Sequence, residues 1–106
     1  MEKRGRPIGS SIRQNIVEIL HFLKKGYGYE IYKIYIEIFP KITLRSVYYH
    51  LRKGADVGEF KVHKIEKEKG DYSWGEIAEK VYYSLGNAAV PQINPSVKKY
   101  FDKHGR

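Results

Sequence analysis

Apolar residues recur at helical spacing in three successive segments of the N-terminal half of the chain. The first predicts a helix over about 11–25, capped by Ser10 or Ser11, with an apolar face of Ile12, Ile16, Ile19, Leu20 and Leu23. The second predicts a helix over about 28–38, which ends before Pro40 because proline disfavours helical backbone at the preceding residue. Thr43 is suited to cap a third helix over about 44–53, whose apolar positions are Leu44, Val47, Tyr48 and Leu51.

The second half of the chain changes to a strand pattern. β-forming residues over 59–67 and 81–85 predict two strands, and the turn-rich segment between them predicts a β-hairpin. Asn94 followed by Pro95 favours the start of a short helix over about 96–103. We therefore expect an α+β, mostly α, winged helix-turn-helix domain over residues 11–106, with three helices, a hairpin wing and a short C-terminal helix. Residues 1–10 are basic and rich in helix breakers, which predicts a flexible arm.

Charge is unevenly distributed along this arrangement. The chain has 106 residues, enough for one domain, and a net charge of +8. Residues 1–53 hold 11 Lys/Arg and 4 Asp/Glu, whereas residues 54–106 hold 9 and 8. This asymmetry favours a basic face and an acidic partner. The alternative is a uniformly Lys-rich surface, as in thermophile-like compositions.

The side of the third helix opposite its apolar stripe carries the candidate chemistry. A helix fits the major groove of B-DNA, where arginine can bond guanine with two hydrogen bonds and where hydroxyl or imidazole groups can bond base edges or phosphates. The predicted DNA-contacting residues in and just before this helix are Lys41, Thr43, Arg45, Ser46, Tyr49, His50, Arg52 and Lys53. Of these, His50 and Arg52 are expected at the flanks of the face. An ordinary solvated helix face is the alternative.

Short motifs in these elements resemble the PadR-like family of winged-helix regulators. Gly28-Tyr29-Glu30-Ile31-Tyr32-Lys33 is similar to the start of that family's second helix, and Tyr82-Tyr83-Ser84-Leu85 to its second wing strand. Ser46-Val47-Tyr48, Leu51-Arg52-Lys53 and Gly58 resemble its third-helix signature. The resemblance spans roughly residues 12–87 and overlaps with ArsR- and MarR-like families. It implies a winged-helix fold, duplex DNA as ligand, dimeric binding and a role in repression.

The chain also departs from that family's pattern. Gly54 stands where leucine is usual, and Glu59 replaces an apolar residue before the first wing strand. The segment between the wing strands is longer than usual, and the C-terminal helix is short. A homodimer is expected nonetheless, with Ile12, Val97, Tyr100 and Phe101 as candidate contacts.

The arm and the hairpin add further basic residues. Arg4-Gly5-Arg6-Pro7 resembles the core of an AT-hook, in which Arg4 and Arg6 would lie in a narrow minor groove; a non-specific basic terminus is the alternative. Lys64, Lys67 and Lys69 could place the wing on phosphates, although Glu66 and Glu68 alternate with the lysines and a solvated hairpin is equally compatible.

No pattern in the sequence indicates an enzyme. There is no cysteine, the four histidines lack ligand spacing, and no nucleophile triad or phosphate-binding loop is present, so neither metal nor cofactor is expected. No apolar run approaches the ~20 residues of a membrane span, and a cytoplasmic location without membrane contact is expected. The expected partners are duplex DNA and a second copy of the chain. The rival classes are a protein-interaction module and a single-strand or RNA binder that stacks bases on exposed tyrosines.

Overall fold

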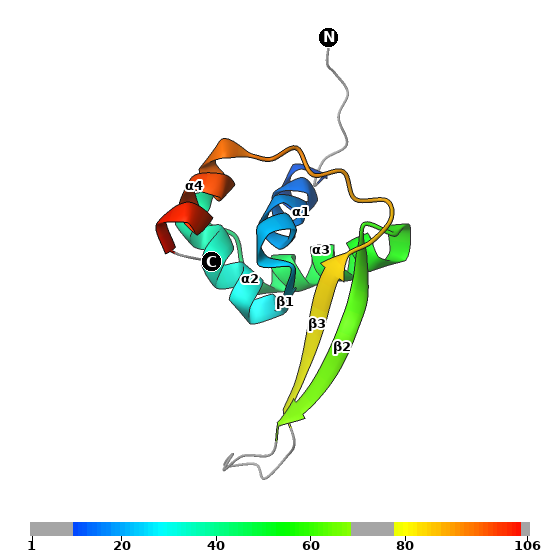
Figure 1. The fold of residues 1–106 in the computed structure, drawn as a ribbon. Coiled ribbons are helices and arrows are strands. Elements are labelled where there is room, and N and C mark those ends of the chain that lie inside the picture. Colours follow the sequence, from blue (N-terminus) through cyan, green and yellow to red (C-terminus); the bar gives the residue numbers. More distant parts are fainter. Residues whose placement is uncertain (1–9, 69–77, 105–106) are drawn as a thin grey trace.

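The computed structural model describes residues 10–68 and 78–104, with side chains described over 11–63 and 80–104. In chain order these residues form α1 (Ser10–Leu23), β1 (Lys25–Tyr27), α2 (Gly28–Ile38), α3 (Leu44–Val57), β2 (Phe60–Glu68), β3 (Ala78–Leu85) and α4 (Pro95–His104) (Figure 1). The fold class is therefore α+β, and mostly helical in these residues, as expected.

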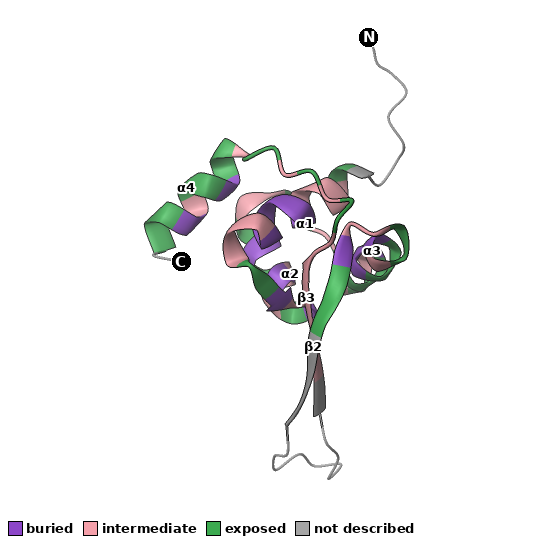
Figure 2. Cartoon of the chain, turned by 45° about the vertical axis from the view of Figure 1, so that its right-hand side comes forward, coloured by how far each residue is buried: buried purple, intermediate pink, exposed green. Residues whose placement is uncertain are grey.

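The core lies where α1, α2 and α3 converge, with α4 added on one side (Figure 2). The apolar stripe expected for α1 is confirmed, since Ile16, Ile19 and Leu20 are fully buried. α4 inserts Val97 and Phe101 into the same core. The expected cap of α4 is also confirmed, because the Asn94 side-chain oxygen accepts from the Ser96 backbone N–H at 2.8 Å. Val97 and Phe101 are thus buried in the chain's own core, which contradicts their expected place in a dimer contact.

The sheet has an element that periodicity could not predict. The predicted hairpin of β2 and β3 is confirmed, but β1 also pairs with β3, so the strand order is β1-β3-β2, all antiparallel. β1 has only three residues, which is too short for an alternating pattern to be recognised. It exists because Lys25, Gly26 and Tyr27 pair with residues near the far end of the chain.

α3 continues beyond its predicted end because of how Gly54 packs. A Cβ added at Gly54 would lie 2.2 Å from the ring of Phe60, so this glycine makes room for the first side chain of β2 rather than ending the helix. The helix ends instead at Gly58, whose φ of 89° is left-handed and favours glycine. The Phe60 ring is itself buried, so it packs against Gly54 inside the domain.

Candidate nucleic-acid interface

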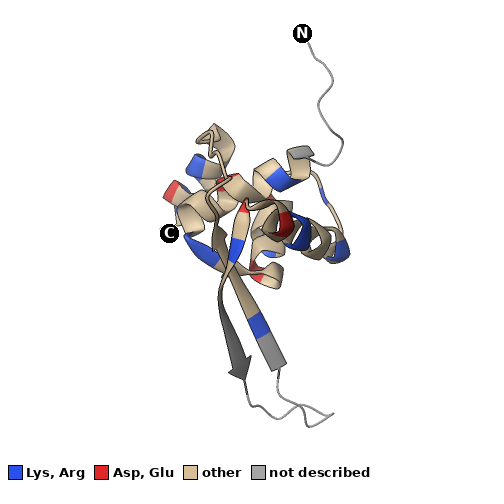
Figure 3. Cartoon of the chain, turned by 90° about the vertical axis from the view of Figure 1, so that its right-hand side faces the viewer, with Lys and Arg blue, Asp and Glu red and all other residues tan. Residues whose placement is uncertain are grey.

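The outer face of α3 carries a row of exposed side chains. Val47, His50, Leu51 and Gly54 are the buried residues of the helix. At about 100° per residue, Arg45, Tyr49 and Arg52 fall on the opposite side, and all three are exposed. We call these three residues the α3 row. The Tyr49 side chain is 56% exposed, and Figure 3 shows Lys and Arg segments along this helix.

Two residues of α3 differ from their predicted positions. Tyr48 was expected in the apolar stripe but is 41% exposed, and His50 was expected at the flank of the DNA-contacting face but is only 7% exposed. The buried stripe instead includes His50 and Gly54, and Gly54 packs against the Phe60 ring of β2. That contact joins two elements, so the spacing within the helix alone does not contain it.

The first turn of α3 is ordered by the predicted cap. Thr43 Oγ1 accepts a hydrogen bond from the Ser46 backbone N–H at 3.0 Å, which confirms Thr43 as the N-cap. Lys41 and Thr43 are exposed and Ser46 is half-buried, so the residues around this turn face solvent next to Arg45. Lys53 is exposed as well, beside the α3 row.

His50 occupies a polar position inside the domain. Its Nδ1 is buried and has no hydrogen-bond partner among the described residues. Burial lowers the pKa of His50, and the Arg13 guanidinium lowers it further. Arg13 itself pairs with Glu59, with 2.7 Å between Nε and Oε1. This ion pair gives the half-buried Glu59 a charged partner.

Tyrosines gather where α3 meets the sheet, a cluster that the sequence analysis did not predict. A Cβ on Gly28 would lie 2.2 Å from the Tyr48 ring, so glycine allows this ring to pack on the start of α2. Burial raises the pKa of Tyr48, with smaller contributions from Tyr83 and Tyr27. The Tyr27 ring lies edge-on to the Tyr82 ring, with 5.4 Å between the two centroids. Lys80 Nζ lies over the Tyr27 ring, 4.8 Å from its centroid. The high content of ten tyrosines could have indicated an aromatic cluster. Its position could not be predicted, because it depends on β1, which the sequence analysis did not predict.

The remaining predicted contacts fall outside the described part of the chain. Arg4, Arg6 and Lys69 are not described, and Lys67 is described only as a backbone position in β2, paired with Glu79. Residues 69–77, which connect β2 to β3 in the sequence, also lie outside the described residues.

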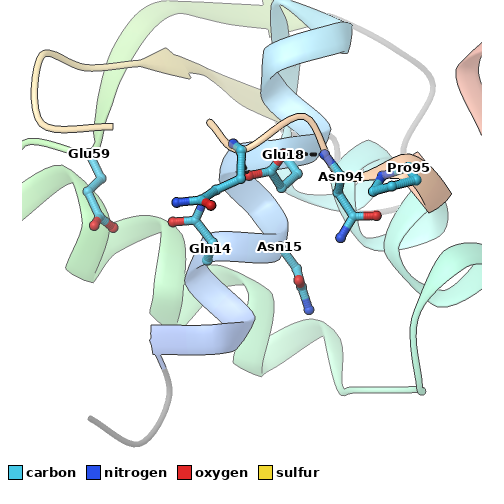
Figure 4. Close-up of a pocket in the computed structure, with 7 residues that line it drawn as sticks. Gln14, Asn15, Glu18, Glu59, Asn94 and Pro95 are labelled. Atoms are coloured by element: carbon cyan, nitrogen blue, oxygen red, sulfur yellow. Dashed lines mark hydrogen bonds between the residues drawn. The ribbon is translucent and has the colours of Figure 1, made fainter. Parts of the chain in front are cut away.

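A polar hollow lies between α1 and the segment leading to α4, and the hydrogen bonds of its side chains have a structural role (Figure 4). Glu18, 2% exposed, accepts from the backbone N–H groups of Gln92 and Asn94 at 2.6 and 2.9 Å. Gln14 donates to Glu18 and to the Val90 carbonyl at 2.7 and 2.9 Å. These hydrogen bonds hold residues 90–94 against α1, which is a sufficient reason for the buried carboxylate. Sequence reasoning missed Glu18 because its partners are backbone groups far along the chain.

The described residues contain no group of three or more His, Cys, Asp or Glu that could hold a metal ion. Over the same ranges, no helix has the length and apolar character needed to cross a membrane. The chain matches no protein-family profile and no curated protein.

Proposed function

We propose that this chain is a winged-helix, sequence-specific regulator of transcription that binds duplex DNA with α3 in the major groove. The observation that carries the proposal is the α3 row: Arg45, Tyr49 and Arg52 are exposed on one side of a helix whose other side is buried. The β2–β3 hairpin projects from the helices beside α3, in the position of a wing (Figure 1). The PadR-like motifs of α2 and α3 support the same proposal.

The positions of Arg45 and Asp56 favour the N-terminal half of α3 as the part that enters the groove. Arg45 lies in the first turn, and the first turns of a recognition helix usually reach the base edges. Asp56, near the other end of the helix, is exposed on the same side as the row. A carboxylate there would repel phosphates, so the duplex would pass the C-terminal end of α3 at a distance.

Substitutions on α3 test this proposal. We expect Arg45→Ala to weaken binding to the preferred duplex by ~1–3 kcal/mol and to relax the preference at one base pair. Lys53→Ala should weaken all duplexes about equally, because a phosphate contact carries no base information. Lys99→Ala is the matched control, since Lys99 is an exposed lysine on α4. The measurement is selection from random duplexes, followed by affinity at several salt concentrations.

Two results would replace the proposal. If the folded Arg45→Ala and Tyr49→Ala variants keep the wild-type affinity for duplex DNA and the wild-type sequence preference, α3 does not bind the bases. The favoured function would then be that of a protein-interaction module. If the wild-type protein prefers unpaired strands, the exposed Tyr29, Tyr48 and Tyr49 become the candidate stacking residues of a single-strand binder.

We further propose that the protein binds DNA as a homodimer. A single winged-helix module makes a small interface of roughly 600–1,000 Å², and a two-fold site doubles it. With Val97 and Phe101 buried, the half-buried Ile12 and Tyr100 remain as candidate contacts. Light scattering with and without DNA tests this proposal, and a monomer in both conditions would contradict it.

A further inference from the structure

A basic hollow lies where the end of α1 meets the sheet. Three lysines contribute to it, Lys24, Lys25 and Lys61, together with the imidazoles of His21 and His63 and the Ser84 side chain. Leu20 and Leu23 of α1 and Leu85 of β3 also line it. We call these six polar residues the α1–sheet cluster.

The cluster is on the side of the sheet that faces away from α3. Phe60 packs on Gly54 of α3, and side chains alternate along a strand, so Lys61 points to the opposite face. Lys25, Ser84 and Lys61 are Cα partners in adjacent strands, which places them in one row across β1, β3 and β2. Directly opposite residues on one face have neighbouring side chains, so Ser84 lies between two lysines.

Two features of the cluster are unfavourable for the folded chain by itself. The Ser84 Oγ is buried without a hydrogen-bond partner among the described residues, which leaves a desolvated hydroxyl unsatisfied. Lys24 has a φ of 79°, in the left-handed region where a helix end normally carries glycine or asparagine. Strained backbone and unsatisfied polar groups gather at functional sites more than elsewhere.

The cluster also lacks negative charge. Among the described residues, no carboxylate lines the hollow, and Lys24, Lys25 and Lys61 form no ion pair. Three ammonium groups and a hydroxyl donor around one hollow suit a compact anion that accepts several hydrogen bonds.

From this convergence we infer that the α1–sheet cluster binds a phosphate group, at a site separate from α3. The phosphate can belong to a small phosphorylated molecule or to a nucleic-acid backbone that approaches the far side of the sheet. Lys25 and Lys61 neutralise it from two sides, Lys24 closes the α1 end, and Ser84 donates its hydroxyl.

Nuclear magnetic resonance titrations of the full chain test the inference with three probes. These are inorganic phosphate, a nucleoside 5′-monophosphate, and a short duplex added to an Arg45→Ala/Arg52→Ala background in which α3 is weakened. Each is compared with chloride at equal ionic strength. We expect saturable shifts of the backbone signals of residues 24, 25, 61 and 84. Shifts with the small probes identify a phosphorylated ligand; shifts with the duplex alone identify a backbone contact.

Four variants separate binding from folding. Lys25→Gln/Lys61→Gln should weaken binding about tenfold or more, because two charged donors are lost, whereas Lys99→Gln/Lys103→Gln removes the same charge from α4 and should leave it unchanged. Lys24→Gly and Ser84→Ala should weaken binding while keeping or raising the melting temperature, since each relieves an unfavourable feature.

The outcomes that overturn the inference are equally definite. They are shifts no larger than those with chloride for all three probes, an equal loss in the α4 control, or Lys24→Gly and Ser84→Ala proteins that bind like wild type. None of these results depends on whether α3 binds DNA, so failure here and failure of the proposed function are distinguishable.

Discussion

At the scale of single residues, His50 is a titratable side chain on the buried and otherwise apolar side of α3. It lies on the buried side of α3 with its Nδ1 unpartnered among the described residues, close to the Arg13–Glu59 ion pair. A neutral imidazole tolerates this site, whereas a protonated one would be desolvated next to a guanidinium. The histidine that appeared to be a candidate DNA contact is therefore a group whose protonation opposes folding.

We predict that His50 makes the fold less stable in mild acid. The pKa of His50 is lowered in the folded chain from its ordinary value of 6.5, so below that pH the unfolded chain binds a proton that the folded chain resists. The contribution of His50 is complete above this value and is lost as the pH falls through the folded pKa. Thermal unfolding between about pH 8 and pH 5 should show this loss, and His50→Gln should reduce it. Equal slopes in both proteins would assign the effect to other groups.

A second prediction concerns Gly54. In an exposed helix interior, replacing glycine by alanine stabilises by roughly 1 kcal/mol. Here the added methyl group would overlap the buried Phe60 ring, and we expect Gly54→Ala to destabilise by about 1–3 kcal/mol. Denaturant unfolding gives the sign of the change. Adding Phe60→Leu should reduce the difference between glycine and alanine, whereas a stabilised single variant would show that the ring does not fill this space.

At the scale of elements, local pattern predicted the helices better than their ends and faces. The predicted bounds of α2 match the observed Gly28–Ile38, because the apolar repeat and Pro40 are both local signals. β1, the extension of α3 to Val57 and the displaced stripe of α3 all depend on pairing with β3 or packing under Phe60. Spacing within one element contains no information about such partners.

In the candidate site, too, local pattern predicted some residues correctly and failed where contacts between elements decide. Arg45, Tyr49 and Lys53 are exposed on α3 as predicted from helical geometry, and Thr43 caps the helix as predicted from its position. The predicted exposure of His50 was wrong, and the tyrosine cluster was not predicted. Both depend on which element packs against α3. Binding of DNA by these residues stays a prediction.

The segment between β3 and α4 supports a prediction at this scale. Glu18 holds it through the backbone N–H groups of Gln92 and Asn94. Glu18→Ala removes both acceptors, and we expect it to destabilise the fold by about 1–3 kcal/mol and to increase hydrogen exchange in residues 90–94. Gln14→Ala, which leaves these two backbone bonds in place, is the milder comparison. Unchanged exchange in the Glu18 variant would mean that packing alone holds the segment.

At the scale of the whole molecule, the net positive charge lies mainly in the first half of the chain, because most of the acidic residues lie in the second half. On α3 it lies on the outer face, and the α1–sheet cluster adds basic residues on the far side of the sheet. An acidic polymer can therefore approach from more than one direction. For the proposed function, this distribution predicts binding that weakens steeply as salt increases.

Deleting residues 1–8 tests the contribution of the arm, which lies outside the described residues. The deletion removes Lys3, Arg4 and Arg6. We expect little change in melting temperature and a shallower salt dependence of duplex binding, by up to ~0.9 per lost phosphate contact. Affinity for A·T-rich duplexes should fall most. If that affinity does not change, the arm does not bind in the minor groove.

The central position of β3 has a consequence for how the chain reaches this structure. Both of its neighbours precede it in the sequence, and β1 lies between the first two helices. During synthesis, β1 and β2 emerge before β3, the strand that pairs with both of them. Their backbone N–H and C=O groups therefore stay hydrogen-bonded to water until β3 has been synthesised. Helices can form early, but closing the sheet requires contacts between distant parts of the chain. We therefore predict that the pairing of β1 with β3, which joins the N-terminal helices to the hairpin, forms late in folding.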